Sequence, residues 1–218
     1  MGGWAEFILA FAAFLVSHSL PVRPAVKARL SAMLTPPGFT LAYSALSLAA
    51  LAWLISAAGR APVVELWAWA PWQTYVTLAS MVLACGVVAL AIGRPNPLSF
   101  GGGDNDSFDP SHPGIVGWCR HPLLLALLLW SLGHIAPNGD LAHVLLFGTF
   151  AGFSLLGMRL IDLRTRRAMG QAEWNRLAGT RREVRITRAD LVRLSAGLLV
   201  FALLLLGHGP VIGIQPVL

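Results

Sequence analysis

Charged residues are scarce in this sequence. Aspartate, glutamate, lysine and arginine together make up 12% of its 218 residues, whereas a soluble domain carries roughly 25%. This scarcity excludes an ordinary soluble domain. Apolar residues account for 56% of the chain, and the mean hydropathy is +0.67. The composition therefore predicts an integral membrane protein, and the length allows one compact helical bundle without a separate soluble domain.

Residues with obvious metal-binding or catalytic potential are also few. The two cysteines, Cys85 and Cys119, are too few for a disulfide framework and are typical of small apolar side chains in a core. Neither a His-Glu-x-x-His motif nor a cluster of Cys and His indicates zinc. The acidic residues lie in predicted loops or at helix edges, so neither a catalytic triad nor a carboxylate pair is expected.

Residues 94–117 form a predicted loop rich in glycine, proline and aspartate. Its three consecutive glycines at 101–103 lack the preceding strand, the spaced glycines and the following Lys-Ser/Thr of a phosphate-binding loop. The pattern predicts a flexible connector.

Long apolar runs dominate the rest of the chain. Each spans about 17 to 21 residues, enough to cross an apolar membrane core of ~30 Å. The predicted spans are residues 4–20, 39–58 and 73–93, the stretch from Cys119 to His134, and residues 141–161 and 191–208. The sequence therefore predicts an all-α polytopic membrane bundle of about six transmembrane helices, forming a single domain over residues 1–218.

The basic residues indicate an orientation. Of the sixteen lysines and arginines, all except Arg60 lie in the connections after the first, third and fifth spans. Positive charge flanks membrane helices on the cytoplasmic side, so we expect both termini to be periplasmic. Because these charges flank apolar spans without interleaved aromatic platforms, no nucleic-acid partner is expected.

Ten arginines lie between Arg159 and Arg193, against four acidic residues. Apolar side chains alternate with them, which predicts a basic cytoplasmic amphipathic segment at 159–193. Such a segment lies on anionic membrane lipid or docks an acidic partner, and the pattern favours lipid.

His18 and His134 are the two histidines expected deep within the apolar spans, because the other four lie in a loop or at the ends of spans. An ionisable side chain at such a depth is rare and marks a candidate functional site. Imidazoles from two helices can bind a haem iron from opposite faces, so His18 and His134 are candidate iron ligands. At ~1.5 Å per residue their depths differ by about 9 Å, which a tilted macrocycle tolerates. Alternatively, His134 only hydrogen-bonds a neighbouring carbonyl.

Arg120 and His121 open the fourth span at its cytoplasmic end. Arginine suits carboxylates, so both side chains are candidates for binding the propionates of a haem. Alternatively, Arg120 extends to lipid headgroups and His121 bonds the neighbouring turn.

Several motifs together resemble the NnrU family, a family of bacterial inner-membrane proteins associated with denitrification and nitric oxide reductase. The matching segments are Ser17-His18-Ser19, Arg120-His121-Pro122, Trp130-Ser131-Leu132-Gly133-His134, and Asn138-Gly139-Asp140. The resemblance implies a bacterial inner-membrane location, a role in nitric oxide or nitrite respiration, and partners such as nitric oxide reductase subunits or an electron donor.

The same family includes ζ-carotene isomerase, a membrane enzyme that uses haem b. The resemblance carries its axial histidines to His18 and His134, and so implies haem b here. Ser131 stands where that enzyme has a cysteine proposed as a switchable ligand, and a serine cannot bind iron as a thiolate.

Whether the protein is an enzyme is left open by the sequence. One alternative is a haem-dependent cis-trans isomerase of a carotenoid-like substrate. Another is a cofactor-free membrane assembly factor. A more distant resemblance, to membrane methyltransferases that also have Arg-His-Pro opening a helix, is weakened because residues 161–167 lack their acidic pair.

Overall fold

The computed structural model describes residues 3–180 and 186–216, and within these ranges the regular structure is helical. The only strand-like pairing there is an isolated bridge between Glu65 and Asp140. The all-α prediction is confirmed. In chain order the helices are α1 (Trp4–Ser19), α2 (Pro24–Leu34), α3 (Pro36–Arg60), α4 (Pro71–Ala91), the short 3₁₀ turns η1 (Asn105–Ser107) and η2 (Gly114–Gly117), α5 (Pro122–Ile135), α6 (Leu141–Met169), α7 (Gln171–Ala178) and α8 (Arg188–Ile212).

Proline sets where many of these helices begin. Pro24, Pro36, Pro71 and Pro122 each occupy the first turn of a helix, where the missing N–H has no intrahelical partner in any case. The helices are apolar over most of their length, so packing and lipid rather than hydrogen bonds between side chains stabilise them.

Four helices in the described ranges are long and apolar enough to cross a membrane: α3, α4, α6 and α8. The count becomes five if α1 and α2, which are bent by 80° at their junction, form one broken span. α5 has 14 residues, or about 21 Å, and so is shorter than the expected spans. α6 is longer, because no residue breaks the helix between Ile161 and Met169.

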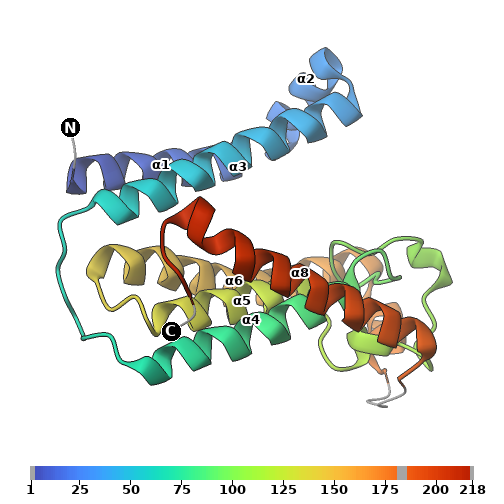
Figure 1. Ribbon diagram of the computed structural model, residues 1–218. Helices are drawn as coiled ribbons and strands as arrows, with labels where there is room; N and C mark the ends of the chain where they lie inside the picture. The colour runs from blue at the N-terminus through green and yellow to red at the C-terminus, as the bar shows by residue number, and fades with distance from the viewer. Residues whose placement is uncertain (1–2, 181–185, 217–218) are drawn as a thin grey trace. The chain divides into compact units, whose positions relative to one another are not determined.

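The chain divides into two compact units. The first contains residues 1–67 and 140–146. In it α1 and α3 run side by side, with α2 against α3 (Figure 1). The Tyr43 hydroxyl donates to the His18 carbonyl at 3.3 Å, and Arg60 binds Glu6 across the opposite end of the helix pair.

The second unit contains residues 68–139 and 147–218. α4 packs against both α5 and α8 (Figure 1). Glycines permit the close approach: a Cβ on Gly133 would lie 2.7 Å from Ser80 Cβ, and one on Gly197 would lie 2.9 Å from the Cys85 carbonyl oxygen. Small residues at helix contacts are typical of membrane bundles.

Candidate functional site

The connection that precedes α5 packs against α7 through a few of its residues. Leu98 and Val116 are buried against Leu177 of α7. Gly102 lies so close to the Asn96 backbone that a Cβ there would come within 2.8 Å of the Asn96 nitrogen. The connector at 94–117 therefore has packed segments, and its flexibility stays a prediction. Its glycines serve close packing, and its few apolar side chains form a small core with α7.

This connection positions Arg120. The Asn96 side-chain amide donates to the Arg120 carbonyl at 2.9 Å, and the Asn96 backbone N–H donates to the Asn105 side chain at 2.8 Å. Arg94 forms an ion pair with Asp190 near the start of α8. Hydrogen bonds within residues 94–120 and an ion pair with α8 therefore position the segment that leads into α5.

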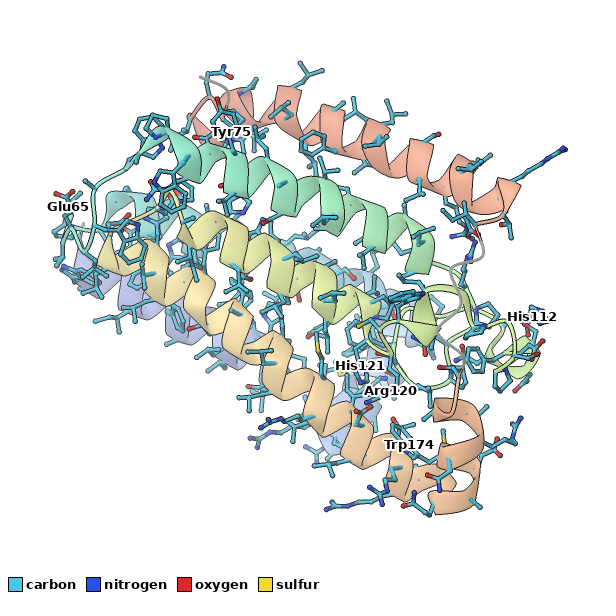
Figure 2. The ribbon with its side chains drawn as sticks, turned by 90° about the horizontal axis from the view of Figure 1, so that it is seen from below. Glu65, Tyr75, His112, Arg120, His121 and Trp174 are labelled. Atoms are coloured by element: carbon cyan, nitrogen blue, oxygen red, sulfur yellow. The ribbon has the colours of Figure 1, made fainter. Side chains whose placement is uncertain are left out.

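Asp162 of α6 binds both residues that open α5. His121 Nε2 lies 2.8 Å from one carboxylate oxygen of Asp162. Arg120 reaches both oxygens of Asp162, with its Nε at 3.2 Å and a terminal nitrogen at 2.7 Å. Figure 2 shows Arg120 and His121 side by side, beside α6. The fork geometry is the one in which arginine binds carboxylates most strongly.

Ser99 completes a line of three side chains. Its hydroxyl lies 3.0 Å from His121 Nδ1, on the opposite side of the imidazole from Asp162. His121 is only 4% exposed, and these two bonds give each of its ring nitrogens a partner. The sequence did not indicate that a serine and an aspartate would lie on the two sides of this histidine.

α7 covers the guanidinium of Arg120. The Trp174 ring centre lies 5.7 Å from Arg120 Cζ, within the range of a cation–π contact. The bond to Asp162 raises the pKa of Arg120, so this arginine stays charged. Residues from four segments therefore meet at one cluster, which we call the Asp162 cluster: Ser99, Arg120, His121, Asp162 and Trp174.

Sequence reasoning missed Asp162 and Ser99 as members of a site. One signal was available: Asp162 is the only acidic residue in α6, and four arginines surround it at 159–167. The part of the basic segment at 181–185 lies outside the described residues.

His134 lies near the other end of α5. Its Nδ1 is 2.8 Å from the Trp130 carbonyl one turn earlier, and its ring contacts the Trp130 and Phe147 rings, with centroid distances of 5.4 and 5.2 Å. The hydrogen bond to a neighbouring carbonyl that the sequence allowed is present. It uses Nδ1 as the donor and leaves the lone pair on Nε2.

His18, in the first unit, has the same arrangement. Its Nδ1 is 2.9 Å from the Phe14 carbonyl four residues earlier, and its ring packs on Phe14 at 3.9 Å. Within residues 3–180 and 186–216, no hydrogen bond is found to Nε2 of either His18 or His134. Both imidazoles are thus oriented by the backbone with Nε2 as the open nitrogen.

The structure brings Arg120 and His121 together and separates them from His134. His134 follows His121 by thirteen positions along α5, or about 20 Å at ~1.5 Å per residue. In the described part of the chain, no group of three or more His, Cys, Asp or Glu side chains could hold a metal ion.

The remaining histidines have local partners. His112 binds Asp109 at 2.8 Å, and the hydrogen bonds of Asp109 lower the pKa of that carboxyl to about 2. Asp140 caps α6, accepting from the His143 backbone N–H at 3.2 Å. His208 Nδ1 lies 2.7 Å from the Ile214 carbonyl.

Cys119, beside the cluster, provides a test of how well this region excludes water. Burial raises the pKa of its thiol, so the thiol is protonated at neutral pH and we expect it to react slowly. In a Cys85→Ser background, maleimide should label Cys119 more slowly at pH 7 than it labels a free thiol. Labelling at the free-thiol rate would contradict the packing described here.

Helices of this length and composition, with exposed apolar side chains along them, define an α-helical membrane protein. A family model described as NnrU protein matches residues 6–216, nearly the whole chain, and the chain belongs to the NnrU family. No curated protein and no solved structure matches the chain.

Proposed function

We propose that this NnrU-family membrane protein binds haem b, with His18 and His134 as its iron ligands, and that it supports nitric oxide or nitrite respiration. The observation that carries the proposal is that the rings of His18 and His134 are oriented in the same way. In each, the carbonyl four residues earlier takes Nδ1–H and leaves Nε2 open. A ring nitrogen fixed in this way by a backbone acceptor is typical of histidines that bind metals.

The two imidazole ligands fit haem b better than they fit a metal ion without a porphyrin. Two neutral imidazoles suit haem iron, whereas a structural zinc site needs four ligands from the protein. The aromatic rings around His134 provide an apolar wall of the kind a porphyrin packs against. When bound, the haem would supply one-electron chemistry, and the chain would orient the ligands and exclude water.

Arg120 and His121 are not part of this proposal. They lie about 20 Å along α5 from His134, which is beyond the reach of the propionates of a haem ligated by His134. Both are also bound to Asp162. We assign them to positioning α5 against α6.

Ser131 favours electron handling or maturation over isomerisation. Its side chain is fully buried, and its hydroxyl donates to the Leu127 carbonyl at 2.7 Å. A serine held in this way cannot act as a switchable ligand. The proposed role in nitric oxide or nitrite respiration rests on the family resemblance.

The ligands are tested with variants expressed in haem-replete cells. We expect His18→Ala and His134→Ala each to abolish or strongly shift the Soret band of the purified protein. His112→Ala and His208→Ala are matched controls, because each removes an imidazole with a local partner, and both should retain the band. A Soret band unchanged in His134→Ala would exclude it as a ligand.

A further inference from the structure

One face of α6 changes abruptly from apolar to basic. At 100° per residue, its members fall within an arc of about 100°. They are Phe153, Leu156, Leu160, Leu163, Arg164 and Arg167. The four apolar side chains are exposed, from 49% at Leu163 to 63% at Leu160. In a membrane protein, such a face contacts lipid chains.

The two arginines lie beyond the apolar core of a membrane. α6 has 29 residues, or about 43 Å, which exceeds a core of ~30 Å. Arg164 and Arg167 follow the last exposed leucine of this face, so they lie at the level of lipid headgroups. A hollow in the surface is lined by both arginines together with Leu160 and Leu163.

Other arginines at this end of the protein have protein partners. Arg120 binds Asp162, Arg166 binds Gln171, and Arg176 binds Glu173. Arg193 donates to the carbonyls of Ala89 and Ile92.

Arg164 and Arg167 differ from these. In the ranges 3–180 and 186–216 neither side chain has an ion pair or hydrogen bond. Their charge is therefore available to an anion from outside the chain.

We propose that this face of α6 binds an anionic glycerophospholipid, with its phosphate on Arg164 and Arg167 and its acyl chains along the leucines and Phe153. Two guanidinium groups one turn apart can bind phosphate oxygens as forks. An acidic protein partner would satisfy the arginines but would not use the apolar face that leads into them. A lipid uses both, and the site is independent of haem binding.

The test compares lipid retention by two double variants of equal charge. The full chain is reconstituted with equal amounts of phosphatidylglycerol and phosphatidylcholine, extracted in mild detergent, and analysed by native mass spectrometry. A hydrogen bond between charged groups contributes roughly a factor of ten, and Arg164→Gln/Arg167→Gln removes two such contacts with the lipid phosphate. This double variant should therefore reduce the ratio of retained phosphatidylglycerol to phosphatidylcholine roughly a hundred-fold.

Arg166→Gln/Arg176→Gln is the matched control, because it removes the same charge from arginines that have protein partners. It should retain the wild-type ratio. An equal fall in both double variants would show that general charge attracts the lipid, and no fall in either would exclude the site. Circular dichroism of each variant checks that the helices remain.

Discussion

Replacing Asp162 with alanine should lower the free energy of unfolding by about 3 kcal/mol. The change removes the acceptor of two bonds at once. His121 is almost fully buried and loses the partner of Nε2, whereas Arg120 is partly exposed and is rehydrated at smaller cost. Most of the effect therefore comes from the unsatisfied imidazole. Thermal unfolding in detergent, followed by circular dichroism, measures it.

Asp109→Ala is the matched control for this prediction. Asp109 also binds a histidine, His112, but both side chains are more than half exposed. Exposed ion pairs contribute little, so we expect almost no change in the unfolding temperature. If Asp162→Ala were no less stable than Asp109→Ala, the Asp162 cluster would not hold α5 against α6.

Replacing Gly197 with leucine should separate α4 from α8. A Cβ at position 197 would lie 2.9 Å from the Cys85 carbonyl oxygen and 3.0 Å from Ala89 Cβ. The Cys85 carbonyl belongs to the backbone, so it cannot rotate away as a side chain can. The rest of the leucine side chain would add further atoms in the same direction. Overpacking of this kind costs about 3 kcal/mol at the upper end of its usual range. Detergent stability and proteolysis of the purified variant measure the loss.

Gly207→Leu makes the same change on the same helix. A Cβ at Gly207 would meet nothing within 4 Å. Replacing glycine by leucine also favours the helix by up to about 1 kcal/mol, and this gain applies to both variants. Gly207→Leu should therefore be as stable as the wild type or more stable. Equal behaviour of the two variants would contradict the close α4–α8 contact.

The helices were predictable because their signals are local. Runs of apolar residues and prolines at their first turns fix where most of them begin, and both signals are read without knowing the fold. Helix length was predicted less well. The span expected to end at Ile161 continues to Met169, because arginines are good helix formers and the first breaking residue is Gly170, at φ +84°.

The Asp162 cluster was not predictable, because it depends on how two helices align. α5 and α6 contact each other at several levels. Trp130 meets Phe147 at 5.1 Å, and a Cβ on Gly157 would lie 3.2 Å from the Leu124 side chain. This alignment brings Asp162 to the start of α5. Nothing in the sequence near Arg120 indicates a residue 42 positions later as its partner.

The histidines illustrate the opposite case. His18 and His134 were recognised because an imidazole inside an apolar run is costly wherever the helix packs. The structure adds the orientation of each ring. This orientation is set by a hydrogen bond to the carbonyl four residues earlier, so it also depends only on neighbouring residues of the same helix. Their assignment as haem ligands is a proposal that rests on this orientation and on the family resemblance.

The haem content of the wild-type protein decides whether the chain binds haem b. Protein purified from haem-replete cells is converted to its pyridine haemochrome, and the absorbance is compared with the protein concentration. We expect haem b at one molecule per chain, which is the stoichiometry of a single pair of axial histidines. A colourless protein from the same cells would contradict it.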